Sequence, residues 1–157
     1  MIQEITNGIS NAIYEAFPAY PIELEPIEQE FQSGSFLITF ATVIEKQLMD
    51  NRYYRRYPAE IMYIPKENAD EPVAEMQSVQ EKLMDALEYI TVKGDLVRGI
   101  NRKAVIVDDV LSVSVDYDLH VIKTKPTDPL IESLINKESV SIWRKILLNT
   151  RKDNLFV

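Results

Sequence analysis

The stretch NRYYRRYPAEIMYI, residues 51–64, has the most unusual local composition of the chain. Three arginines and three tyrosines occupy the six residues Arg52–Tyr57, and the chain then becomes apolar. With the two-residue period of a strand, Tyr57, Ala59, Ile61 and Tyr63 share one face, and the arginines and Glu60 divide between the two faces. The stretch therefore predicts a strand around which helices and other strands can pack.

The strongest strand pattern follows later in the chain. Val110 to Ile122 alternates five times between apolar and polar side chains, as a half-buried strand does. Lys103 to Val107 precedes it, and Asp108–Asp109 forms a plausible two-residue turn between the two segments. These residues predict a β-hairpin.

Other segments predict two further strands and a loop. Phe36 to Ile44 is rich in aromatic and β-branched residues, which predicts a central strand. Glu45 to Asp50 is polar and is expected to form a loop. Ile22 to Ile27 is interrupted by Pro26, so it is expected to be a short edge strand, because proline cannot donate to a central ladder.

Two segments have the apolar period of helices. Ile2 to Phe17 carries one apolar stripe and ends before Pro18. The second helix begins at Asp70–Glu71–Pro72, where an acidic cap and an early proline favour a helix start. Its stripe runs from Val73 to Ile90, and a turn is expected at 91–95. Together the patterns predict two main helices and four to six strands.

Composition limits the classes of protein and partner. The chain has 157 residues, of which 46% are hydrophobic and none is cysteine, which suits one domain with a C-terminal tail. No apolar run approaches the roughly 20 residues of a membrane span, and no signal peptide is expected at the N-terminus. The net charge of −8 weighs against nucleic acid as a direct binding partner, because phosphate binding requires a basic face.

The chemical motifs in the chain are weak. Gly94 to Gly99 has the glycine spacing of a phosphate loop but is followed by Ile100 and Asn101, where Lys and Ser or Thr are required. Asp116, Asp118 and His120 lie on one face of a predicted strand and have the chemistry of a metal site. A solvated polar face explains the same alternation, so no catalytic, metal or cofactor-binding residues are assigned.

The Arg/Tyr stretch, Arg52–Tyr57, has three interpretations. Interleaved cations and rings can stack and pair with single-stranded nucleic acid. The stretch can equally be an ordinary strand with snorkelling arginines. The third interpretation is a protein–protein contact, because Arg and Tyr are enriched at interface hot spots. The charge of −8 favours the protein contact over nucleic acid.

Several segments together resemble a known family. In order and spacing, residues 2–123 are similar to the tail terminator family of phage and prophage tails. The resemblance is carried by Glu4–Ile9, Asn51–Pro58, Glu88–Val92, Leu96–Gly99 and Val107–Tyr117. It implies an α/β (α+β) fold, with a mixed, mostly antiparallel sheet and the two helices on one face. Residues 1–125 would form this domain, and residues 126–157 a linker and short helix or tail.

The resemblance also implies a structural role without a reaction or cofactor. Family members form a ring, usually of six subunits, that caps the tail tube, stops its polymerisation and joins the tail to the neck. The expected partners are further copies of the chain, the tube protein and a neck protein, with DNA passing through the channel without specific binding. Assembly in the host cytoplasm and a final place at the head-proximal end of the virion tail follow.

Two sets of site residues follow from this expected role. Arg52, Tyr53, Tyr54, Arg55, Arg56 and Tyr57 are expected at a subunit or tube-protein contact, because of their composition. Asp116 and Asp118 are expected to line the channel, where like charge lets DNA slide. The alternatives are a head–tail connector or neck protein of similar size, and a small metal-dependent hydrolase using Asp116, Asp118 and His120.

Overall fold

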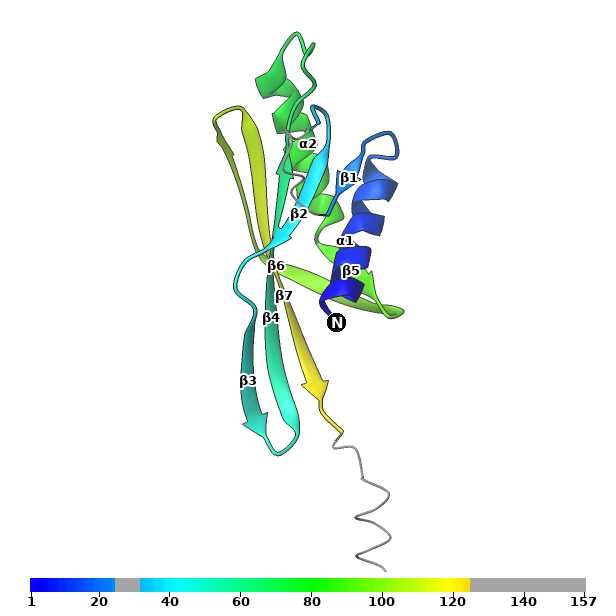
Figure 1. Ribbon diagram of the computed structural model, residues 1–157, viewed down its shortest axis with the longest axis vertical. Coiled ribbons are helices and arrows are strands. Elements are labelled where there is room, and N and C mark those ends of the chain that lie inside the picture. Colours follow the sequence, from blue (N-terminus) through cyan, green and yellow to red (C-terminus); the bar gives the residue numbers. More distant parts are fainter. Residues whose placement is uncertain (25–31, 125–157) are drawn as a thin grey trace, which may run out of the picture. The chain divides into compact units, whose positions relative to one another are not determined.

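The computed structural model describes residues 1–24 and 32–124, and the predicted tail at 126–157 lies outside these residues. Residues Met1–Ile122 form one compact unit. Figure 1 shows its elements, in the order α1 (Ile2–Ala16), β1 (Ile22–Glu23), β2 (Phe36–Phe40), β3 (Ile44–Met49), β4 (Arg52–Tyr63), α2 (Pro72–Ala86), β5 (Tyr89–Val92), β6 (Asp95–Val107) and β7 (Val110–Ile122). The predicted edge strand is confirmed at β1; Ile27 lies outside the described residues.

The sheet is mixed and mostly antiparallel, as predicted. Six strands follow one another in the order β1-β2-β4-β7-β6-β5, and β3 adds to β4 beside this path. Only β1 and β2 are parallel among these pairs. The longest pairing joins β4 to β7, from Arg52 opposite Ile122 to Tyr63 opposite Leu111. The predicted hairpin is confirmed, with Asp108 and Asp109 both at positive φ in its turn.

Two predictions in the region before β4 were wrong. Glu45–Asp50 is no loop, because β3 covers most of it, and the strand expected over Phe36–Ile44 stops at Phe40. Both β2 and β3 pair with the same edge of β4, on either side of Pro58. The carbonyl of Pro58 accepts from the Ala41 N–H on this edge, so the missing proline N–H faces the same edge. The ladder cannot continue there, and one long neighbour becomes two strands.

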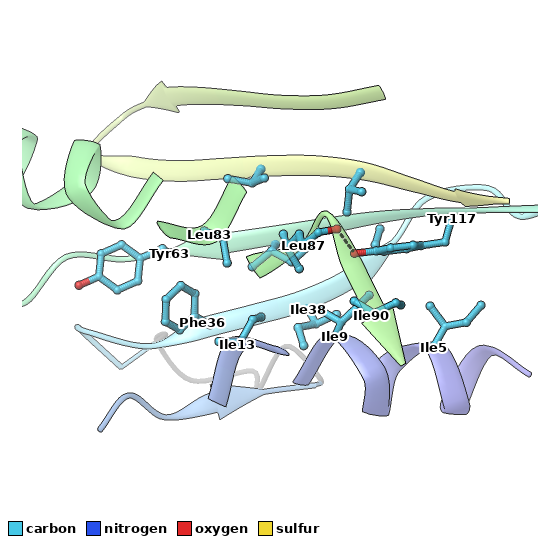
Figure 2. Close-up of a cluster of buried hydrophobic side chains, with 14 of the residues drawn as sticks. Ile5, Ile9, Ile13, Phe36, Ile38, Tyr63, Leu83, Leu87, Ile90 and Tyr117 are labelled. Carbon is cyan, nitrogen blue, oxygen red and sulfur yellow. Dashed lines mark hydrogen bonds between the residues drawn. The ribbon is translucent and has the colours of Figure 1, made fainter. Parts of the chain in front are cut away.

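The two helices contribute to a core against one face of the sheet. Ile5, Ile9 and Ile13 of α1 are buried, as are Met76, Val79 and Leu83 of α2. They meet the sheet residues Tyr57, Ala59, Ile61, Tyr63, Val113, Val115 and Tyr117, which are also buried. Figure 2 shows this cluster. The structure therefore confirms that Tyr57, Ala59, Ile61 and Tyr63 share a buried face, as do the apolar side chains Val113, Val115 and Tyr117 of the hairpin strand.

The second helix ends earlier than its apolar stripe predicted. Ile90 lies in β5, and α2 ends at Ala86. Two groups from the sheet satisfy backbone carbonyls after the helix: the Tyr117 hydroxyl donates to Leu87 O at 2.9 Å, and the Gly99 N–H donates to Glu88 O at 2.7 Å. These tertiary hydrogen bonds stabilise an end that the local sequence does not mark. Ile90 is buried in β5, as it would be in a longer helix, so the apolar period alone does not distinguish a helix from a strand at this position.

Candidate functional site

The Arg/Tyr stretch forms the first half of β4, between β3 and the end of β7. Arg52 to Arg56 pairs with β3 on one edge and with Leu119–Ile122 and Asp118 on the other. All residues of β3 are exposed, and those of β4 between Tyr53 and Arg56 are half-buried. We call β3, Arg52–Arg56 and Asp118–Ile122 the three-stranded extension. Figure 1 shows it continuing past α1 and α2, and no residue of β3 or of Arg52–Arg56 is buried.

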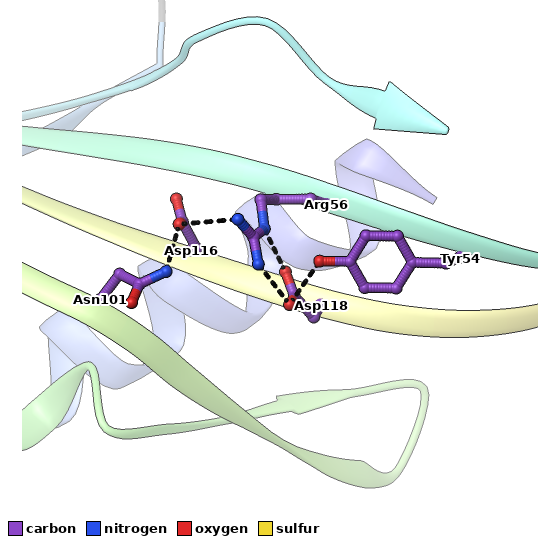
Figure 3. Close-up of polar contacts among 5 residues, drawn as sticks. All are labelled: Tyr54, Arg56, Asn101, Asp116 and Asp118. Carbon is purple, nitrogen blue, oxygen red and sulfur yellow. Dashed lines mark hydrogen bonds and ion pairs between the residues drawn. The ribbon is translucent and has the colours of Figure 1, made fainter. Parts of the chain in front are cut away.

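Arg56 and Asp118 form the central contact on the face opposite the helices. The two residues are paired across β4 and β7. Arg56 Nε donates to Asp118 Oδ1 at 2.9 Å, and Arg56 Nη2 donates to Asp118 Oδ2 at 3.0 Å. The Tyr54 hydroxyl donates to the same Oδ2 at 2.6 Å (Figure 3). Two predicted interface residues and one predicted channel residue therefore belong to a single cluster.

Asp116 lies beside this cluster and has a different partner. The amide of Asn101 donates to Asp116 Oδ2 at 2.9 Å, whereas Arg56 Nη1 is 3.9 Å from the same oxygen. Asn101 has a positive φ of 52° at the bulge where the register between β6 and β7 shifts. The sequence interpretation missed Asn101; asparagine's tolerance of this backbone conformation is the signal that marks such a position.

The hydrogen bonds fix the charge state of the cluster. The bond from Arg56 is the largest cause that lowers the pKa of Asp118 below its ordinary value, against an opposing effect of burial. The same carboxylate raises the pKa of Tyr54, chiefly by accepting its hydrogen bond. Asp118 is therefore ionised and Tyr54 protonated at neutral pH, and the Asp118 charge is compensated by Arg56.

The remaining predicted interface residues differ in how much surface they offer. Arg52 is exposed at the start of β4. Arg55 lies on the helix-side face and its Nε is 2.5 Å from Glu45 Oε2 of β3. Tyr57 is 4% exposed and belongs to the core. Within the stretch, Arg52 is therefore exposed, the four residues from Tyr53 to Arg56 are half-buried, and Tyr57 is buried.

The Asp116, Asp118 and His120 side chains do follow one another on the same face. The His120 ring lies 5.6 Å from the Tyr54 ring, measured between centroids. Both carboxylate oxygens of Asp118 already accept hydrogen bonds from Arg56 or Tyr54. Among residues 1–24 and 32–124, no group of three His, Cys, Asp or Glu residues is placed to hold a metal ion.

The three-stranded extension also carries apolar side chains that the sequence interpretation did not single out. Ile44, Leu48 and Met49 of β3 are 50%, 51% and 69% exposed, and Ile122 at the end of β7 is 66% exposed. Exposed apolar groups beside charged ones are typical of protein-binding surfaces.

Within the described ranges, neither helix is long and apolar enough to cross a membrane.

Comparison with known proteins supplies the family. A family model described as phage tail terminator protein matches residues 4–129. A solved chain titled as part of the virion of a native gene transfer agent particle is 9% identical, with a TM-score of 0.45, covering 74% of this chain and 93% of that one. A second solved chain, whose title states no function, is 12% identical with a TM-score of 0.36, covering 80% and 98%. No curated protein matches the sequence.

Proposed function

Because the chain belongs to the phage tail terminator family, a class of structural virion proteins, we propose that it forms a ring at the end of the tail tube. The ring, of about six copies, stops the polymerisation of the tube protein and presents its other side to a neck protein. The family match over residues 4–129 is the observation that carries this proposal. Assembly takes place in the host cytoplasm, and the finished ring lies at the head-proximal end of the tail.

The three-stranded extension supplies the contact surface in this proposal. Residues 44–56 contain four basic and two acidic side chains, in a chain whose net charge is −8. Arg55 and Arg56 have carboxylate partners within the chain, which leaves Arg52 as the cation of the Arg/Tyr stretch that an acidic group of another copy can attract. Exposed apolar side chains of β3 add the desolvated area that a stable contact requires. Arg52 is exposed at the turn between β3 and β4 and is the cation best placed to reach a neighbour.

The proposal can be tested with purified chain and tube protein. Light scattering and negative-stain microscopy should show a ring, in solution or on tube ends, and tubes polymerised with the chain should be shorter than tubes polymerised alone. Arg52→Glu should abolish ring formation and length control. Arg98→Glu makes the same change at an exposed cation of β6 and should leave both unaltered.

The other outcomes separate the alternatives. Rings that bind a neck protein but leave tube length unaltered would identify a connector. A monomer that binds a divalent ion tightly and does not act on tubes would favour the hydrolase and overturn the proposal. Arg56→Glu is the less useful variant, because it places a carboxylate against Asp118 and disturbs the sheet as well as its surface.

A further inference from the structure

The described sheet has open edges on two opposite sides. At one side β3 pairs with β4, and no described strand lies beyond it. At the other side β6 pairs with β5 only along Asp95–Arg98, so Arg102–Val107 has β7 on one edge and no described strand on the other. β3 is level with Asp118–Ile122 of β7, whereas Lys103–Val107 lies beside Val110–Ser114, so the two edges lie on opposite sides of the β4–β7 pair and at different levels along it.

Both edges expose apolar side chains, although β3 also carries Glu45 and Lys46 and a register shift between Gln47 and Met49. Ile44 is 50% exposed on β3, and Val105 and Val107 are 54% and 56% exposed on β6. Natural sheets protect open edges with charges, proline or bulges, because an open edge is a template for another strand. Arg102 and Lys103 are the two charged side chains of the β6 edge and lie at its start, and the β-branched residues Val105, Ile106 and Val107 follow. Val105–Val107 is therefore the part of the β6 edge that charge leaves unprotected, and Ile44 is an exposed apolar residue of β3 that can lie opposite it.

The two edges also have matching directions and faces. Because β3 is antiparallel to β4, β4 to β7, and β7 to β6, β3 and β6 run in opposite directions. A second copy placed beside the first in the same orientation would therefore bring β6 antiparallel to β3. Lys46 lies across from Tyr54, and Val105 across from Ser112. Both side chains lie on the face opposite the helices, so the face would continue from copy to copy.

We propose that β3 of one copy pairs antiparallel with Arg102–Val107 of the next, which makes one continuous sheet around the assembly. This inference rests on the proposed ring and names its contact. Aligning the two six-residue segments places Ile44 opposite Val107, an apolar pair. A shift of two residues in one direction would place Lys46 opposite Lys103, which like charge disfavours. The contact is heterologous, so it can close into a ring.

The positions of the two edges set the geometry of that ring. Lys46 is level with His120 of β7, and Val105 is level with Ser112, eight residues away. Neighbouring copies would then be displaced by about 19 Å across the strands, which is four strand spacings, and about 26 Å along them. For the ring to close, this displacement must lie in the plane of the ring, so the strands tilt by roughly 50° from the ring axis. Strands of a closed barrel tilt for the same reason, because their register is staggered.

Disulfide trapping tests the pairing, because the chain contains no cysteine. Opposed residues of an antiparallel pair have Cα atoms at about 4.5–5.5 Å, within the range of a disulfide. Assembled chain carrying both Ile44→Cys and Val107→Cys, once oxidised, should give a ladder of covalent multimers on a gel without reductant, and the ladder should collapse with reductant. Each single variant should remain monomeric on the gel. The pair Ile44→Cys with Leu96→Cys is the matched control, since Leu96 is 73% exposed but lies outside the edge.

A second variant tests the same edge without cross-linking. Val105→Lys should reduce the assembled fraction at least tenfold, whereas Leu96→Lys should leave it unaltered, with both chains folded by circular dichroism. Covalent dimers of a single-cysteine variant would indicate a two-fold contact of like edges and overturn the pairing. Rings seen by microscopy without the cross-link would also overturn it, while leaving the proposed function standing. Absence of any assembly, alone or on tube ends, would overturn both.

Discussion

The hydroxyl of Tyr117 gives a sharp test of how the sheet holds the end of α2. Tyr117 and Leu87 are both 0% exposed, and the hydroxyl donates to Leu87 O at 2.9 Å. Tyr117→Phe removes this one oxygen and leaves the ring in place. The buried carbonyl of Leu87 then loses its donor, which costs about 1–3 kcal/mol in the free energy of unfolding. Urea denaturation followed by circular dichroism measures this difference, with an unaltered m-value.

A matched substitution separates the hydrogen bond from the loss of a hydroxyl in general. Tyr14 is 61% exposed on α1, so Tyr14→Phe should change the free energy of unfolding by less than about 0.5 kcal/mol. Burial raises the pKa of Tyr117 above its ordinary value, so the folded state favours the protonated hydroxyl. The contribution is present below about pH 10 and is lost as the pH rises beyond it. Equal stability of Tyr117→Phe and the unmodified chain at pH 7 would refute the proposed role of this bond.

Two further substitutions test the packing of α1 and the charged cluster. Gly8→Ala should destabilise the fold by about 1–3 kcal/mol, because the added Cβ would lie 2.6 Å from Thr91 O; helix propensity alone predicts the opposite sign by about 1 kcal/mol, so a raised urea midpoint would contradict this contact. Asp118→Asn should lower the urea midpoint at pH 7, because it removes the carboxylate that pairs with Arg56. Since that pairing lowers the pKa of Asp118, the stability it provides is present above about pH 4 and lost as the pH falls further; a difference from the unmodified chain that stays constant down to pH 3 would exclude this explanation.

Much of the fold could be predicted because one face of the sheet is buried. The alternation of Val110–Ile122 and the stripe of Ile5, Ile9 and Ile13 are direct consequences of that burial, and the structure confirms both. The resemblance to tail terminators, based on segments within residues 2–123, is likewise confirmed by the family model over residues 4–129.

The errors occur where burial leaves no pattern or fits two patterns. β3 is exposed on both faces, so no alternation marks Ile44–Met49 as a strand, and only its pairing with β4 defines it. Ile90 is buried and satisfies both the helical and the strand period, so contacts from Tyr117 and Gly99 decide between them. These contacts join residues distant in sequence, which local patterns do not contain.

The register between β4 and β7 brings the two sets of predicted site residues together. Composition alone treated the arginines and the aspartates as separate surfaces, one for a neighbour and one for a channel. The pairing of Arg56 with Asp118 joins them and compensates the Asp118 charge. Asp116 accepts from a neutral donor, Asn101, and its nearest arginine nitrogen is more distant, so its negative charge is compensated less than that of Asp118.

A channel that repels DNA would therefore depend on Asp116 more than on Asp118. A contact with a neighbour would depend on Arg52 and the apolar side chains of β3, because Arg56 already has a partner and Tyr57 is buried. The internal pair joins β4 to β7 on the face opposite α1 and α2, the two helices of the described residues. A rigid extension loses less conformational entropy when it binds, which is an advantage for a surface that must join several copies in one geometry. In the proposed ring, the Arg56–Asp118 pair would thus support assembly by holding the extension in place, even though it offers little charge to a partner.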